Sequence, residues 1–217
     1  MANKAIQVAL HSNGVGPQSI GITADGELVH NNRYVSTAAS KRVQLFDDFL
    51  GDVIADQWSA AKGTDPQGVV ATINAGAIGG TVRVTSGDTA VVAESVSILT
   101  HALNWKASNG GLVFEARIIP VTSVADVAYF VGFTDVLATT TLEEPISLSG
   151  TTFTTNASDA VGFVYDTAAT TDVWYGKGVK ADTDSATLTT TSAPVAGTAQ
   201  VLRIEVSSAG AATFYID

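Results

Sequence analysis

The sequence contains no cysteine, which excludes disulfides, thiolate nucleophiles and zinc sites built on thiolates. It is also poor in charge, since Asp, Glu, Lys and Arg make up 15% of the residues, against about a quarter in an average domain. The 11 basic residues against 21 acidic ones leave a net charge of −10. This argues against nucleic acid as a ligand, because phosphate binding needs a basic surface. A surface with so little charge suits a protein that packs against copies of itself or a partner.

Long apolar runs are absent as well. No stretch approaches the roughly 20 consecutive apolar residues that cross a bilayer, and Lys4 is not followed by the apolar run of a signal peptide. We therefore expect synthesis in the cytoplasm without a secretory signal, and no membrane partner.

What the sequence does contain is material for β-structure. Apolar residues make up 46% of the 217 residues, enough for the core of one large all-β domain. β-Branched residues are abundant and helix-forming residues are sparse, so we expect a single helical turn, near residues 52–58. Many strands separated by clusters of Gly, Asn, Asp, Ser and Thr predict an antiparallel β-sandwich or jelly roll.

Two kinds of strand pattern occur from Phe46 onward. Apolar residues at every second position predict strands buried on one face, at residues 81–85, 112–118 and 201–206. Continuous apolar runs predict strands buried on both faces, at residues 127–133 and 160–166. A last strand is expected at residues 212–216. The residues expected to share a buried face are Leu112, Phe114, Ala116 and Ile118 in one run and Leu202, Ile204 and Val206 in another.

Residues 1–45 differ from the rest of the chain. A short strand is expected at residues 5–10, turn-forming residues at 12–17, and a hairpin with Asp25-Gly26 between strands at 20–23 and 28–30. Residues 36–42 resemble a linker. Four basic and two acidic residues give this segment a charge of +2, which leaves −12 for the remainder.

Because this segment has too few large apolar residues for a core, we expect an N-terminal arm ordered by contacts with a partner. An ordinary flexible terminus is the alternative. The residues expected to contact the partner are Ile6, Val8, Leu10, Ile20, Ile22, Arg33, Tyr34, Lys41 and Arg42.

Residues 46–52, Phe-Asp-Asp-Phe-Leu-Gly-Asp, followed by Gln57-Trp58, resemble the opening strand of concanavalin A-like jelly rolls. Further blocks follow in the same order as in a group of jelly-roll proteins of tailed bacteriophages, at residues 111–117, 131–135, 160–166, 202–206 and 212–217. The resemblance covers residues 46–217 and not the arm. It implies a jelly-roll domain in a virion structural protein, such as a capsid decoration or head-fibre protein.

In such domains the motif at residues 214–217 turns and continues into further strands. Here the sequence ends at Asp217. Either another chain completes the sheet or the natural product is longer, so the jelly roll of residues 46–217 is expected to be incomplete at its C-terminus.

Some concanavalin A-like jelly rolls are glycoside hydrolases, which need two carboxylates facing each other across the cleaved bond. Their strand signature, two Glu framing an Asp at alternate positions, is absent here. The acids lodged well inside strands, Glu115 and Glu205, each have an Arg two positions away, Arg117 and Arg203. We interpret them as surface charges paired along and across strands rather than as an acid/base pair. We therefore expect no catalytic residues and no enzyme activity.

Metal sites have few candidate ligands. Without cysteine, a zinc site would need all three histidines, which are scattered along the chain at His11, His30 and His101. Asp-rich turns offer oxygen ligands for calcium at Asp182, Asp184, Asp166 and Asp172. The alternative is that these residues occupy turns because Asp hydrogen-bonds the backbone there. No other cofactor is expected.

Trp174-Tyr175 is the aromatic pair most suited to stacking on a sugar, because the Gly176 that follows suggests a strand entering a turn at the rim. Packing of these rings in the core is the alternative.

The sequence therefore predicts a virion surface protein made in the host cytoplasm. Its arm would bind the major capsid protein or other virion proteins by β-augmentation, and copies would associate, as a homotrimer if the site lies on a capsid threefold axis. A phage tail or surface adhesin that binds host carbohydrate is the alternative, and a glycan-degrading enzyme is the third.

Overall fold

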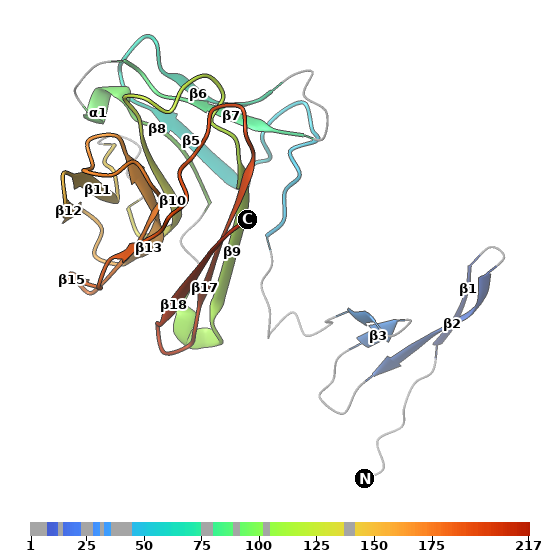
Figure 1. Cartoon of the computed structure of the whole chain (residues 1–217). Coiled ribbons are helices and arrows are strands. Elements are labelled where there is room, and N and C mark those ends of the chain that lie inside the picture. Colours follow the sequence, from blue (N-terminus) through green and yellow to red (C-terminus); the bar gives the residue numbers. More distant parts are fainter. Residues whose placement is uncertain are drawn as a thin grey trace. The chain divides into compact units, whose positions relative to one another are not determined.

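The computed structural model describes residues 8–12, 15–22, 28–30, 33–35, 45–74, 80–88, 92–101, 105–136 and 142–217, with the backbone alone in the first four of these ranges. The chain divides into two compact units, Met1–Asp47 and Asp48–Asp217. Figure 1 shows both units. The boundary lies two residues after the one expected between the arm and the domain.

The first unit is a four-stranded antiparallel sheet with the strands in chain order. The predicted hairpin around Asp25-Gly26 is confirmed, because Ile22 pairs with Leu28 on the next strand. The turn expected at residues 12–17 is shorter than predicted, since Ser12 pairs with Val15 and β2 already includes Gly16 and Pro17. The last strand was not predicted. The strands are β1 (Val8–Ser12), β2 (Val15–Ile22), β3 (Leu28–His30) and β4 (Arg33–Val35).

The second unit is all-β, and its described residues contain one α-helical turn, α1 (Val92–Ser95), and one 3-10 turn, Ala107–Asn109. Its first half holds two strand pairs, β5 (Trp58–Lys62) with β8 (Ser97–His101), and β6 (Val69–Ile73) with β7 (Val82–Thr85).

Two larger antiparallel sheets follow in the chain. One has the order β18-β17-β9, formed by Ala212–Ile216, Gln200–Val206 and Leu112–Ile118. The other has the order β10-β13-β14, formed by Ala128–Thr134, Ala160–Asp166 and Tyr175–Lys180. The outer side of β14 pairs with two short strands, β15 (Thr183–Asp184) and β16 (Leu188–Thr189). A hairpin of β11 (Ile146–Ser149) and β12 (Thr152–Thr155) completes the unit.

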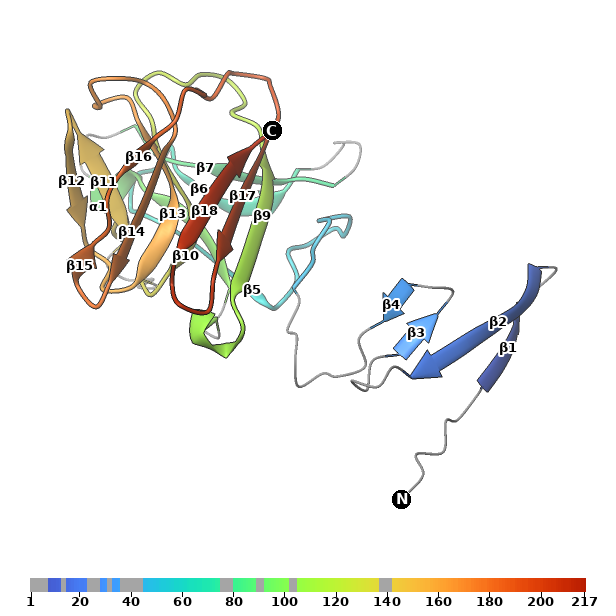
Figure 2. The same ribbon diagram turned by 60° about the horizontal axis from the view of Figure 1, so that its bottom comes forward.

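The main core lies between the two larger sheets. Leu202 and Ile204 of β17 and Phe163 of β13 have no exposed surface, and they pack with apolar side chains of β9, β10 and β18. Figure 2 shows β9, β17 and β18 side by side in one sheet. Two antiparallel sheets packed face to face through interdigitated side chains make a β-sandwich.

A second core lies on the other face of the β10-β13-β14 sheet. There Val164 of β13 and Tyr175 of β14 pack with Ile146 and Leu148 of the β11-β12 hairpin. Strand β13 is therefore buried on both faces, as its continuous apolar run predicts. The alternation predicted for residues 112–118 and 201–206 is also confirmed, since every second side chain there faces the main core.

The helical turn expected at residues 52–58 is wrong. This segment is irregular and ends in a turn closed by the Trp58 N–H, which donates to the Ala55 carbonyl over 2.9 Å. Trp58 itself begins β5, where its ring packs at 5.6 Å from Phe49 and 5.8 Å from His101. Strand pairing and aromatic packing outweigh local helix preference here. No helix in the described residues is long and apolar enough to cross a membrane.

The main core makes a direct prediction about stability. Leu202→Ala should lower the free energy of unfolding by about 2–5 kcal/mol, because the side chain is fully buried and a cavity remains. The matched control is Val113→Ala on β9, where the side chain is 62% exposed, and its effect should stay within about 0.5 kcal/mol. Urea denaturation measures both, and equal effects would contradict the assignment of the core.

Candidate functional site

The expected sugar-binding pair is not at the surface. Trp174 and Tyr175 are 1% and 8% exposed, so the expectation of an exposed aromatic pair is wrong. The Trp174 indole donates to the Gln200 side-chain carbonyl over 3.0 Å, and the Tyr175 hydroxyl donates to the Thr171 carbonyl over 2.9 Å. Trp174 packs in the main core and Tyr175 in the second core. In these positions neither ring can stack on a sugar.

The residues expected to contact a partner are spread over the first unit. Val8 and Leu10 lie on β1, Ile20 and Ile22 on β2, and Arg33 and Tyr34 on β4. Register brings Val8 opposite Ile20. The remaining three, Ile6, Lys41 and Arg42, lie outside the described residues.

Glu115 and Glu205 come together on the exposed face of the β18-β17-β9 sheet. Arg203 lies between them, donating to Glu205 through Nε over 3.0 Å and approaching Glu115 at 3.4 Å. A second guanidinium nitrogen of Arg203 also pairs with Glu205. The hydrogen bond and the charge of Glu205, followed by those of Glu115, raise the pKa of Arg203. This confirms charge pairing along and across strands, although Arg203 alone joins both carboxylates and Arg117 is not part of the cluster.

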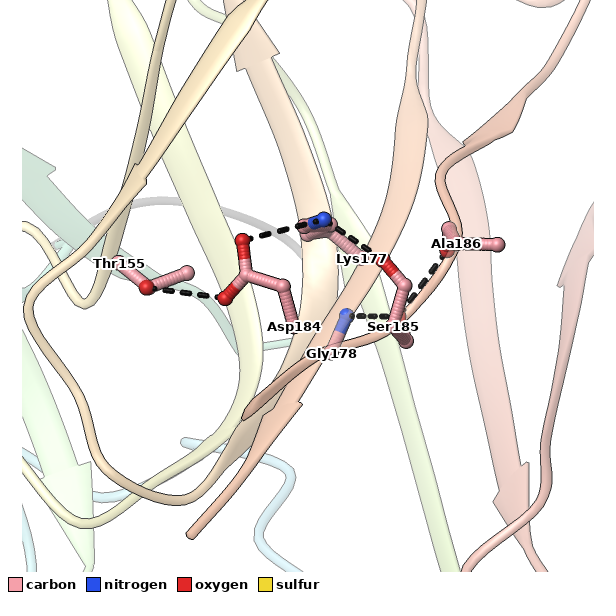
Figure 3. Close-up of polar contacts among 6 residues, drawn as sticks. All are labelled: Thr155, Lys177, Gly178, Asp184, Ser185 and Ala186. Atoms are coloured by element: carbon pink, nitrogen blue, oxygen red, sulfur yellow. Dashed lines mark hydrogen bonds and ion pairs between the residues drawn. The ribbon is translucent and has the colours of Figure 1, made fainter. Parts of the chain in front are cut away.

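A polar cluster that the sequence analysis missed surrounds Lys177 on β14. Its side chain is 7% exposed, and its ammonium group donates to the Ser185 carbonyl over 2.7 Å and lies 3.4 Å from an Asp184 carboxylate oxygen. Figure 3 shows these contacts, with the Thr155 hydroxyl donating to the other Asp184 oxygen over 3.0 Å. The ammonium also lies 5.3 Å from the centre of the Phe153 ring. The cluster thus ties β15 and the residue that follows it to β14 and β12.

The adjoining hairpin turn uses the other carboxylate of the Asp-rich segment. Ala181 and Asp182 both have positive φ angles, 46° and 58°, as a tight two-residue turn between β14 and β15 requires. The Asp182 carboxylate accepts from the Ser158 hydroxyl over 2.7 Å, and the Ala181 N–H donates to the Asp159 carboxylate over 3.2 Å. Asp159 and Asp182 therefore stabilise this turn. The sequence signal that could have predicted the Lys177 cluster is a single basic residue between Gly176 and Gly178.

Asp65 is a buried acid that the sequence analysis missed, and it is 2% exposed. Its carboxylate accepts from the backbone N–H groups of Gln67 over 2.8 Å and Asp88 over 3.0 Å. It therefore joins the loop before β6 to the loop after β7, which is a structural role.

A shallow pocket of about 350 Å³ lies beside Tyr165, between residues 124–126 and the side chains of Thr167 and Asp172. The Tyr165 hydroxyl donates to the Val124 carbonyl over 3.0 Å. Burial raises the pKa of Tyr165, and the charge of Asp172 raises it further. Burial raises the pKa of Glu144 as well, and the charge of Asp166 raises it further.

No three His, Asp or Glu side chains in the described residues come together in a way that could hold a metal ion. The histidines lie on three different strands, His11 on β1, His30 on β3 and His101 on β8. Of the expected calcium ligands, Asp182 and Asp184 accept hydrogen bonds from Ser158 and Thr155. Asp166 accepts from the Ala168 N–H over 2.7 Å.

Scans of the chain against protein-family models, curated proteins and solved structures found no match.

Calcium should leave the stability of the protein unchanged, because the oxygens of Asp182, Asp184 and Asp166 already accept protein hydrogen bonds. Thermal melts in excess EDTA and in millimolar calcium test this. A higher melting temperature in calcium that is lost in Asp182→Asn would contradict it.

The ion pair of the Lys177 cluster makes a prediction about coupling. Asp184→Asn should lower the free energy of unfolding by about 1 kcal/mol, since the Asp184 side chain is 41% exposed and solvent screens the pair. The same Asp184→Asn substitution should cost less when it is made in the Lys177→Met variant, because no buried ammonium group then needs a partner. Denaturant unfolding of the two single variants and the double variant completes the cycle, and additive losses would show that the pair is not coupled.

Proposed function

We propose that this chain is a bacteriophage virion structural protein, a capsid decoration or head-fibre protein. In this proposal the second unit is a concanavalin A-like jelly roll displayed at the virion surface. The first unit is the anchor that contacts the major capsid protein or another virion protein. The protein has no enzyme activity in this proposal.

The observation that carries the proposal is the placement of the blocks that resemble phage jelly rolls. Residues 111–117, 160–166 and 202–206 coincide with β9, β13 and β17, and the block at 212–217 coincides with β18. These strands belong to the two facing sheets of the sandwich. The blocks that resemble the phage proteins therefore correspond to strands that form the main core.

The conspicuous polar side chains of the second unit support a structural role. Glu115 and Glu205 are held by Arg203 on an exposed sheet face. Lys177 and Asp184 fasten a hairpin, and Asp65 joins two loops. Each of these groups stabilises the scaffold.

The first unit supports an anchoring role because it is a separate sheet with a charge of opposite sign. Its outer strand β1 pairs with β2 on one side, and among the described residues it has no partner on the other. Such an edge suits β-augmentation, in which strand addition supplies main-chain hydrogen bonds and many copies on a shell add avidity. The homotrimer expected from threefold capsid sites stays a prediction.

The carbohydrate-binding alternative rested on Trp174 and Tyr175, which belong to the core. No other described residue gives it specific support, so we do not propose it.

Deletion of residues 1–42 should abolish co-sedimentation with undecorated capsids of the phage that encodes the protein, because the anchor is lost. The near-ultraviolet circular dichroism should persist, since Trp58, Trp105 and Trp174 all lie in the second unit. Full-length protein should bind at a fixed copy number per capsid.

A matched variant that replaces Arg33, Lys41 and Arg42 by Ser keeps the strands and removes positive charge. Its binding should weaken and become less sensitive to salt without being lost. Unchanged binding after deletion of residues 1–42 would show that the anchor model is wrong, and full-length protein that ignores capsids would overturn the decoration role.

A further inference from the structure

Strand β18 lies at the edge of its sheet, and a row of its backbone groups has no partner among the strands that the structure describes. Val201 and Asp217 exchange two backbone hydrogen bonds, of 3.1 and 3.0 Å. In an antiparallel ladder such pairs recur at every second residue, so Tyr215 and Thr213 bond to β17. The N–H and C=O groups of Ala212, Phe214 and Ile216 then point away from β17, and none of the other described strands pairs with them.

The sheet that faces β18 is the β10-β13-β14 sheet. On the side of the β18 edge it extends one strand further, to β16. Phe163 on β13, Gly176 on β14 and Leu188 on β16 are neighbours in register, so they share one face of their sheet. Phe214 of β18 covers the first two, because its ring lies 5.2 Å from that of Phe163 and a Cβ added to Gly176 would meet it at 2.9 Å.

Leu188 lies one strand beyond Gly176 and faces the same way. Its side chain is 47% exposed, although it belongs to the face that forms the main core. A strand added to the free edge of β18 would lie about 4.8 Å from it and would therefore cover Leu188. Among the described strands, the β18-β17-β9 sheet thus has no strand opposite β16 of the facing sheet.

The β18 of a second copy, paired antiparallel with its own β14 on the same side, does not fit as the added strand. That strand would bring its own β14 beneath it, as Phe214 and Gly176 require. In the first copy β16 already occupies this place in the lower layer. A single extended segment that has no second layer of its own fits beside β18 without meeting β16.

The chemistry of the edge also fits strand addition. The five residues of β18 are Ala, Thr, Phe, Tyr and Ile, with no charge and no proline to block pairing. Strand β9 at the opposite edge of the same sheet carries Glu115 and Arg117. An uncharged edge above an exposed Leu selects a segment with apolar residues at alternate positions.

We propose that the free edge of β18 is a docking site for an extended segment of a partner polypeptide, which joins the sheet as a fourth strand and covers Leu188 with an apolar side chain. Three N–H and three C=O groups, those of Ala212, Phe214 and Ile216, supply the main-chain hydrogen bonds. The inference goes beyond the proposed function, because it needs no capsid and concerns the second unit alone.

Amide hydrogen exchange of the full chain tests the site, with a short synthetic peptide of alternating valine and threonine, ending in lysines, as the probe. Saturating peptide should slow exchange at Ala212, Phe214 and Ile216 by at least about tenfold, since these N–H groups become bonded. A peptide of the same composition with a central proline should have no effect, because proline cannot pair.

Leu188→Lys should weaken peptide binding about tenfold, since a half-exposed leucine loses its apolar contact. The matched control Val113→Lys changes an exposed residue on β9 and should leave binding unchanged. Equal binding by both variants, or protection at β9 instead of β18, would overturn the proposal.

The same measurement without peptide identifies other occupants. Slow exchange at the three amides that increases with protein concentration would mean that a second copy covers the edge. Slow exchange at every concentration would mean that a segment of the same chain covers it. Either result would overturn docking by a partner, and neither would bear on capsid binding, which the deletion of residues 1–42 tests separately.

Discussion

The second unit depends on one constraint, that the β10-β13-β14 sheet is apolar on both faces. Neighbouring residues of β13, Phe163 and Val164, point into different cores. The sheet can therefore be stable only when both the β18-β17-β9 sheet and the β11-β12 hairpin cover it. At about 25 cal/mol per Å² of apolar surface removed from water, this burial dominates the stability of the unit.

The polar groups follow from the same constraint. A layer buried on both sides has turns and edges that still carry polar backbone and side-chain groups, and each needs a partner. Lys177 finds Asp184 and the Ser185 carbonyl, and the Ala181-Asp182 turn finds Ser158 and Asp159. This explains why Asp182 and Asp184, which suggest metal ligands in the sequence, stabilise turns and strand ends in the structure.

The strands whose burial is set by a single repeating pattern could be predicted from the sequence. Strands β9, β13, β17 and β18 alternate or run continuously apolar, and their positions are confirmed to within one residue. Strand β14 was missed because its Tyr-Gly-Lys-Gly sequence is typical of a turn. Gly176 is there to make room for the Phe214 ring, a contact between residues far apart in the chain. The same misinterpreted glycine made Trp174 and Tyr175 seem exposed, whereas the fold buries both. Local patterns do not contain that information.

The pairing of β9 with β17 has a consequence for how the chain folds. Glu115 and Arg203, which face each other across these strands, are 88 residues apart in the sequence. During synthesis β9 has no partner on that side until β17 emerges, so its apolar residues stay exposed while the intervening chain is made. Non-local pairing of this kind makes folding slow and leaves intermediates open to aggregation. The β18-β17-β9 sheet therefore cannot form during synthesis until β17 has emerged.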